Sequence, residues 1–176
     1  MADHSALHRM HGIKEAPVDS ATVFESGRCA HLHGWWAACE AGEPPPKKAF
    51  DITDHGGIVA HLFLVQRNAS GFTFRLYGEE AIHILGVNPS GMSVRTFSME
   101  RYGYDLEEYY RTVCDSRRCY RCSGRLAMAA REHFRFESVD CPLTDAAGGI
   151  SHIIGVIDLI ERVNAPALAE GDDERR

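Results

Sequence analysis

The sequence contains no long hydrophobic run and no surplus of basic residues, and both absences restrict what the protein can bind. Within its 176 residues, no apolar stretch approaches the roughly 20 residues that a bilayer-spanning helix needs. The N-terminal stretch MADHSALHRMHG lacks the apolar core of a secretion signal. The net charge is −6, whereas a nucleic-acid-binding surface needs a basic face. We therefore expect a cytoplasmic protein that binds neither membranes nor nucleic acid.

The sequence motifs that accompany catalysis are also missing. There is no Gly-x-Ser-x-Gly elbow, no phosphate loop that ends in Gly-Lys-Ser/Thr, no histidine-kinase box and no nucleotide-cyclase signature. Glu79 and Glu80 are adjacent, but neighbours on a helix do not face each other, and a helix start favours negative charge. We therefore assign no catalytic residue and expect that the protein is not an enzyme.

The six cysteines are too sparse for a disulfide scaffold, so we expect free thiols. Cys119 and Cys122 have the spacing Cys-x-x-Cys, with Cys114, His133 and Cys141 nearby. Zinc needs about four ligands, and a second tight pair is absent from the sequence. On an extended strand, residues 119 and 122 also point to opposite faces. We interpret these cysteines as core and surface residues and assign no metal site, while a zinc or redox role stays an alternative.

The composition is that of one globular domain with irregular ends. Hydrophobic residues make up 44% of the chain, which is enough for a core. Residues 1–22 are polar without a sustained period, and residues 164–176 are rich in charge. We therefore expect a flexible arm over residues 1–22, a domain over residues 23–163 and a disordered charged tail over residues 164–176.

The most regular pattern is a strand pair in the C-terminal third of the chain. Phe134 and Phe136 alternate with charged residues, which is the period of a half-buried strand. Pro142 has no N–H to donate, so it is expected to end this strand. The pair Gly148–Gly149 suits a hairpin turn. The return strand over residues 150–160 is too apolar to contact water on both faces.

The sequence before this hairpin predicts helices and strands that alternate in an α+β order. The fold class we predict is a five-stranded antiparallel sheet with short helices on one side and an extra N-terminal helix. Asp105 is an expected helix cap, and Gly124 marks a bulge or a close approach. The expected elements are a helix over 26–41, strands over 58–66 and 72–77, a short helix over 79–85, an irregular or single-turn segment over 91–99, a helix over 106–114 and a strand over 119–130.

Two aromatic stretches suggest which side chains face the core. In the strand FTFRLY, Phe72, Phe74 and Leu76 should share one face. Trp35 and Trp36 diverge by about 100° on a helix, so only one of them can pack on the sheet while the other is available to a partner.

The order of elements resembles a PAS domain, the small sensory fold of bacterial signalling proteins. The resemblance rests on the strand end Phe-Arg-Leu-x-Gly at Phe74–Gly78, on the spacing of Leu85, Gly86 and Gly91, and on the closing strand Ile-Ile-Gly-Val-Ile-Asp-Leu-Ile-Glu. It covers about residues 35–161 and is similar to a PAS subfamily that is common as short stand-alone proteins in alphaproteobacteria.

This resemblance implies a non-catalytic sensory or protein-interaction module in bacterial signalling. A small ligand between the sheet and the short helices, or a partner on the sheet, would shift the conformation. The resemblance also implies a homodimer, with Trp35 and Trp36 as candidate contacts, and a signalling partner that acts in trans. Arg75 could hold an anionic ligand or remain a solvated strand residue. The candidate pocket residues are Phe74, Arg75, Tyr77, His83, His133 and Phe136.

Three alternatives stay open, namely a cofactor-bearing sensor, a ligand-free adaptor and a small enzyme. Some PAS domains bind haem through a histidine on the helix before the last three strands, but the helix over 106–114 contains none. His83 could replace that ligand. A photoactive flavin needs an Asn-Cys-Arg-Phe type of motif, which is absent. In the adaptor, Phe72, Phe74 and Phe136 would fill the cavity.

Overall fold

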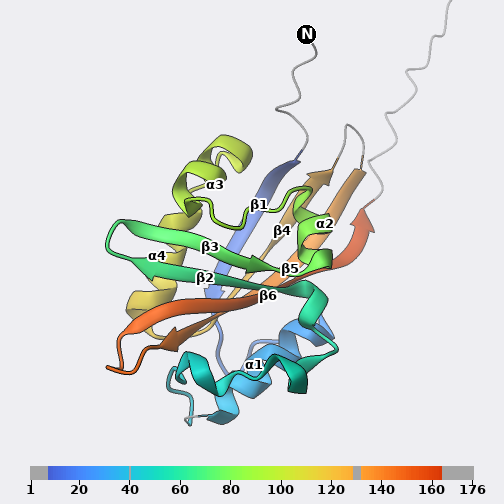
Figure 1. The fold of residues 1–176 in the computed structure, drawn as a ribbon. Helices are drawn as coiled ribbons and strands as arrows, with labels where there is room; N and C mark the ends of the chain where they lie inside the picture. The colour runs from blue at the N-terminus through green and yellow to red at the C-terminus, as the bar shows by residue number, and fades with distance from the viewer. Residues whose placement is uncertain (1–7, 40, 129–131, 164–176) are drawn as a thin grey trace, which may run out of the picture.

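The computed structural model describes residues 8–39, 41–128 and 132–163 (Figure 1). These residues form one antiparallel sheet with helices on both of its faces. The elements in chain order are β1 (His8–Pro17), α1 (Gly27–Cys39), η2 (Lys47–Ala49), η3 (Ile52–His55), η4 (Val59–His61), β2 (Leu62–Asn68), β3 (Gly71–Tyr77), α2 (Glu79–Leu85), α3 (Val94–Tyr102), α4 (Leu106–Ser116), β4 (Tyr120–Met128), β5 (Glu132–Thr144) and β6 (Ile150–Val163), where η denotes a 3-10 helix.

The strand order in the sheet is β1-β4-β5-β6-β2-β3. The long hairpin of β5 and β6 occupies the centre, and the hairpin of β2 and β3 extends the sheet from β6 to one edge. The α+β class and the five predicted antiparallel strands are therefore confirmed. The sheet has one strand more than the sequence analysis predicted.

The additional strand is β1, so the prediction of a flexible arm over residues 1–22 is wrong for residues 8–17. β1 pairs with β4 along the other edge of the sheet and shifts register between His11 and Lys14. Gly124 lies opposite this shift, where a side chain would come within 3.0 Å of the His11 carbonyl oxygen and also crowd Ile13. The predicted close approach at Gly124 is thus confirmed. Residues 1–7 and the predicted tail over 164–176 lie outside the described residues.

The two faces of the sheet carry separate hydrophobic cores, which we call the inner and the outer face. Helices α2, α3 and α4 cover the inner face, whereas α1 packs on the outer face against β5 and β6 (Figure 1). In β6, Ile153 and Ile157 belong to the inner core, and Ile154 and Val156 belong to the outer core. Burial on both sides explains why β6 is apolar over residues 153–157.

Three element boundaries differ from the predicted ones. β5 continues through Pro142, which pairs with Ile153, because β4 ends opposite Asp140 and Pro142 therefore lies at an edge position, where a proline is tolerated. The Pro142 carbonyl accepts a hydrogen bond from the Trp36 indole at 2.8 Å. The segment predicted as irregular contains α3, a nine-residue helix that ends at Gly103 with a φ of +62°. The start of the strand predicted over 58–66 is instead η4.

A β-bulge in β3 reverses the predicted faces at the end of that strand. Leu64 of β2 pairs with Leu76, but the next residue of β2, Val65, pairs with Phe74, so Arg75 is the extra residue. The bulge places Leu76 on the outer face and Tyr77 on the inner face, the reverse of what strict alternation from Phe74 would give. The prediction that Phe72, Phe74 and Leu76 share one face is therefore wrong for Leu76. This one-residue shift creates part of the candidate site.

Gly155 of β6 is a position where we expect a side chain to destabilise the fold. It pairs with Phe63, and a Cβ atom there would overlap the phenyl ring of Phe63. Gly155→Ala should therefore lower the free energy of unfolding by about 1–3 kcal/mol, the usual cost of overpacking a core. Urea denaturation tests this, with Gly149→Ala as the control, because a Cβ there comes no closer than 3.6 Å to its neighbours. Equal effects of the two substitutions would contradict the expectation.

Candidate functional site

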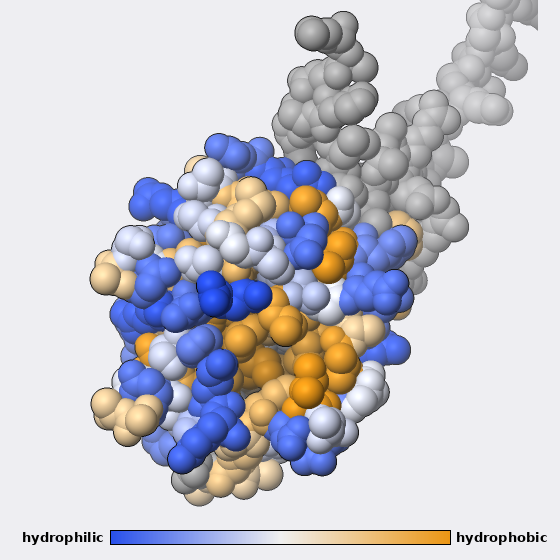
Figure 2. All heavy atoms as spheres, viewed as in Figure 1, coloured by the Kyte–Doolittle hydropathy of each residue, from blue (hydrophilic) through white to orange (hydrophobic). Residues whose placement is uncertain are grey.

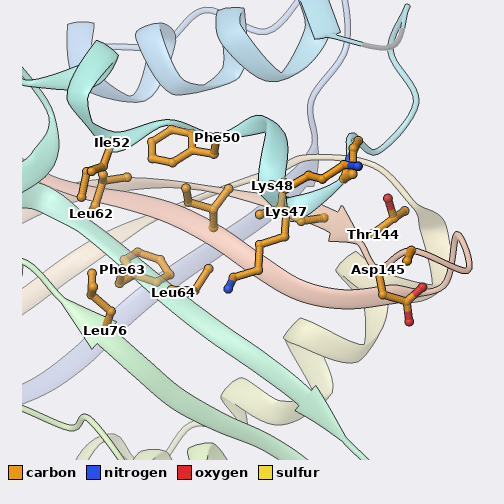
Figure 3. Close-up of a pocket in the computed structure, with 14 residues that line it drawn as sticks. Lys47, Lys48, Phe50, Ile52, Leu62, Phe63, Leu64, Leu76, Thr144 and Asp145 are labelled. Carbon is orange, nitrogen blue, oxygen red and sulfur yellow. The ribbon is translucent and has the colours of Figure 1, made fainter.

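A groove of about 540 Å³ opens on the outer face, beside α1. Its floor is a row of three aliphatic residues, because Leu76 pairs with Leu64 across β3 and β2, and Leu64 pairs with Ile154 across β2 and β6. Residues 46–52, which we call the roof segment, form the facing wall (Figure 3). Figure 2 shows a hollow on this face with hydrophobic side chains gathered around it. We call this site the outer groove.

The roof segment is attached at both ends. At one end, the Thr144 backbone N–H donates to the Pro45 carbonyl at 2.9 Å, and Pro46 forms a bridge with Thr144. At the other end, the ring of Phe50 stacks on His55 at 4.5 Å and meets Trp35 of α1 edge-on at 4.9 Å. The same segment therefore walls the groove and contacts the N-terminal helix.

The rim of the outer groove is positively charged. Lys47 and Lys48 extend from η2 above the groove (Figure 3). His152 of β6 pairs with Gln66 of β2, one residue beyond Val65, where the bulge holds Arg75 beside the groove residue Leu76. Burial lowers the pKa of His152, and the positive charges of Lys47 and Arg75 lower it further. Asp145 is the acid among the residues that line the groove, and it accepts hydrogen bonds from the backbone N–H groups of its own turn at 2.8 and 3.1 Å. Asp51, also in the roof segment, accepts a hydrogen bond from the Thr53 backbone N–H at 2.9 Å.

The cavity that the PAS resemblance implies, between the sheet and the helices of the inner face, is much smaller. Its volume is about 40 Å³, which leaves room for roughly three water molecules at about 10–15 Å³ each. Aromatic rings from the sheet and the helices fill the rest of the space. We call this the inner chamber, and its aromatic lining consists of Phe63, Phe74, Tyr77, Phe97, Tyr102, Tyr104, Tyr109, Tyr110 and Phe136.

Asp140 of β5 lies in the inner chamber and is almost fully buried. The Tyr109 hydroxyl donates to its carboxyl group at 2.7 Å, and the Ser138 hydroxyl donates to the same oxygen at 3.1 Å. Burial raises the pKa of Asp140 to about 7, although both hydrogen bonds act to lower it. The hydroxyls of Tyr102 and Tyr104 are buried in the same chamber and have no partner among the described residues. Sequence reasoning missed Asp140.

The predicted pocket residues are divided among several places. Phe74, Tyr77 and Phe136 meet in the inner chamber. Arg75 is exposed at the β-bulge, outside the inner chamber and near the rim of the outer groove. His83 of α2 is exposed and lines a surface hollow instead. His133 belongs to β5, but its side chain lies outside the described part of the chain.

The two tryptophans of α1 diverge as expected. Trp36 is buried on the sheet together with Cys29 and Leu32. Trp35 is half-buried, and its ring contacts Phe50 and also the ring of His55 at 5.7 Å. Trp35 therefore has partners within the chain, and any contact that it makes with a second protein stays a prediction.

Two acids hold the start of α1 on the outer face, and we call Glu137 and Asp158 the carboxylate clamp. They pair directly across β5 and β6. Glu137 accepts hydrogen bonds from the backbone N–H of Ser26 at 2.6 Å and from the side chain of Arg121. Asp158 accepts from the Ser26 hydroxyl at 2.8 Å and from Arg28 at 3.1 Å. Sequence reasoning missed the clamp, although an acid within the apolar run of β6 was a usable signal.

The cysteines are arranged for packing. Cys119 lies in the outer core and Cys122 in the inner core, as the strand period predicts. Cys119 lies opposite Cys141, and their sulfur atoms are 2.8 Å apart in the buried outer core. Burial and the neighbouring thiol raise the pKa of Cys141. Within the residues that the structure describes, no group of three or more His, Cys, Asp or Glu side chains could hold a metal ion.

The architecture is that of a PAS-like domain, with an antiparallel sheet, short helices on its inner face and an N-terminal helix on its outer face. Its fold is similar to the solved structure of an RNA-binding Light-Oxygen-Voltage receptor, with a TM-score of 0.50 and 14% sequence identity. The match covers 84% of this chain and 38% of the receptor chain, so this chain spans well under half of that protein. At this identity the similarity concerns the fold.

Sequence comparisons add no closer assignment. No family model matches the sequence, and no curated protein matches it. Among the described helices, none is long and apolar enough to cross a membrane.

Proposed function

We propose that this chain is a non-catalytic PAS-type sensory module that binds a small apolar ligand in the outer groove and signals through α1. One observation carries the proposal: the roof segment that walls the groove also contacts α1 through Phe50 and Trp35. The groove volume of about 540 Å³ lies within the range of about 300–1,000 Å³ that is typical of small-molecule sites. A ligand there touches the sheet and the roof segment together.

The inner chamber is the weaker candidate for this ligand. Its free volume of about 40 Å³ is more than ten times smaller than that of the groove. Phe74 and Phe136, which we predicted as pocket residues, take up space there as core residues. The likeness to a Light-Oxygen-Voltage receptor therefore does not carry a ligand site over to this chain.

The signal follows from two alternative positions of α1. A ligand that displaces the roof segment changes the contact of Phe50 with Trp35, while the carboxylate clamp holds the start of α1 on the sheet. The ligand shifts the equilibrium by its difference in affinity for the two positions. We propose that the protein is a cytoplasmic homodimer and that α1 is contacted either by the second copy or by a signalling partner in trans. RNA binding belongs to the structural neighbour, and the net charge of −6 argues against it here.

The dye Nile red, which is neutral and apolar, tests the groove as a ligand site. We expect the protein to enhance Nile red fluorescence, and Leu76→Gln to weaken that binding at least fivefold, because it places an amide on the floor. Leu76 is already 43% exposed, so the variant should remain folded. Val23→Gln is the matched control, because Val23 is 79% exposed and does not line the groove.

The alternatives give different results in the same preparation. Equal Nile red binding by both variants would contradict the groove as the site. If the unmodified protein is a dimer that does not bind the dye, and Leu76→Gln dissociates this dimer, the ligand-free adaptor would be favoured. A visible absorption band or a bound metal in the purified protein would favour the cofactor-bearing sensor.

A further inference from the structure

We propose that the outer groove binds an unbranched amphipathic carboxylate of the fatty-acid class. Its hydrocarbon chain lies on the aliphatic floor, and its carboxylate meets the cations of the rim at Lys47 and Arg75. This inference rests on the proposed function, because it names the ligand class of the same site.

The apolar half of the ligand follows from the floor and the roof. Leu76, Leu64 and Ile154 form a continuous row across three neighbouring strands, and Ile52 faces them from the roof segment (Figure 3). Ile52 and Leu76 are each 43% exposed, which leaves apolar surface in contact with water. An unbranched hydrocarbon chain covers such a row without requiring hydrogen-bond partners, whereas a nucleotide base would require several.

The charged half of the ligand follows from the rim. Within the described residues, no ion pair engages Lys47, Lys48 or Arg75. Lys47 and Arg75 act on the same imidazole, that of His152, whose Nδ1 lies 2.9 Å from the Ser151 hydroxyl. A group of unpaired cations in a chain of net charge −6 is complementary to an anion. A carboxylate at this end of the groove would neutralise them.

The size of the groove favours a small molecule over a protein segment. A stable protein interface buries about 1,200–2,000 Å² of total surface. The outer groove instead matches the volume of small-molecule sites, and one wall of it is formed by the chain's own roof segment. A protein partner that competes for this groove is therefore an outcome of the test below rather than part of the proposal.

Calorimetric titration with octanoate, decanoate and dodecanoate, each below its micelle concentration, tests the apolar half. We expect the affinity to rise about tenfold for each added pair of methylene groups, because each buried methylene contributes a constant increment. An affinity that does not depend on chain length would overturn the proposal, since the hydrocarbon would then not lie in the groove.

A comparison of decanoate with decanol tests the charged half. We expect decanoate to bind about five- to tenfold more tightly at low salt, and we expect Lys47→Glu to abolish this preference. Lys14→Glu is the matched control, because it makes the same charge change on exposed β1, away from the groove. If both Lys47→Glu and Lys14→Glu abolish the preference for decanoate over decanol, the cations of the rim do not bind the carboxylate locally, and this part of the proposal is overturned.

His152 provides a second readout inside the folded protein. Decanoate should raise the pKa of His152, measured by NMR, because an anion offsets Lys47 and Arg75, whereas decanol should leave it unchanged or lower it by burial. Equal binding of decanol and decanoate, with no rise in this pKa, would overturn the ligand class while Nile red binding still supported the groove. Failure of decanoate, decanol and Nile red together would refute the proposed function itself.

Discussion

Glu137→Ala should lower the free energy of unfolding by about 3 kcal/mol. Breaking a buried ion pair from one side typically costs about 3–5 kcal/mol, because the remaining polar groups lose their partner. Glu137 is fully buried, and its loss would leave the backbone N–H of Ser26 unpaired and would leave Arg121 with the exposed Glu25 in place of a buried partner. We expect the lower end of the range, because the Arg121 side chain is 26% exposed and can rehydrate.

Urea denaturation measures this effect, and Glu25→Ala is the matched control. Glu25 also pairs with Arg121, at 3.5 Å, but its side chain is 40% exposed. Exposed ion pairs contribute about 0–1 kcal/mol, so Glu25→Ala should change the free energy of unfolding by no more than that. If Glu137→Ala is as mild as Glu25→Ala, the clamp does not hold α1 on the sheet.

Asp140 should make the stability of the protein fall as the pH rises from 5 to 8, and Asp140→Asn should remove this contribution. Burial raises the pKa of Asp140 from an ordinary 3.8 to about 7 in the folded protein. Between these two values the folded state binds more protons than the unfolded state, so stability decreases with pH. The contribution of this one group between pH 5 and pH 8 is about 2–3 kcal/mol.

Comparing wild type with Asp140→Asn separates the contribution of Asp140 to the pH dependence of stability from the contributions of other titrating groups. Burial lowers the pKa of His33, His55 and His152, so these histidines lower the stability toward acid pH, in the opposite direction. Because they are present in both proteins, their effect cancels in the difference between wild type and Asp140→Asn. Urea denaturation at pH 5 and pH 8 gives that difference. A variant that follows the same pH dependence as wild type would show that Asp140 is charged in the folded state.

The sequence predicted the elements whose pattern is local. The helix α4 begins after Asp105, which accepts a hydrogen bond from the Glu108 N–H at 3.1 Å, as its capping chemistry requires. The short helix α2 ends at Gly86, whose φ of +72° is the left-handed conformation that favours glycine. The hairpin of β5 and β6 follows from strand period and turn residues. Each of these features needs only a few neighbouring residues to specify it.

The features that sequence reasoning missed depend on contacts between distant segments. β1 is a polar edge strand, so it lacks a clear hydrophobic period, and only its pairing with β4 shows it. The bulge at Arg75 depends on register with β2, and it reverses the face of Leu76. Nothing in the residues next to Asp140 in the sequence distinguishes it from an exposed acid. Its burial among aromatic rings comes from α4 packing on β5.

The candidate site was only partly predictable for the same reason. Three predicted pocket residues do meet, but they fill the inner chamber with aromatic rings. The groove floor combines residues from three strands, and its roof comes from the segment between α1 and β2, for which the sequence analysis predicted no site residue. The sequence analysis left Arg75 either as a holder of an anionic ligand or as a solvated strand residue, and the anion-holding role stays a prediction that the groove now makes testable.

The unequal number of helices on the two faces of the sheet determines where this protein can still be approached. Strands lie about 4.8 Å apart, so six of them span roughly 24 Å, whereas a helix with its side chains is about 10–12 Å wide. Three helices shield one side, whereas on the other side α1 shields about half of the sheet and the roof segment lies over β2 and β3 without filling the groove beneath it. The outer surface of β2 and β3 is therefore only partly covered by the chain itself. A ligand that binds there would cover apolar sheet surface, as a packed helix does on the other face.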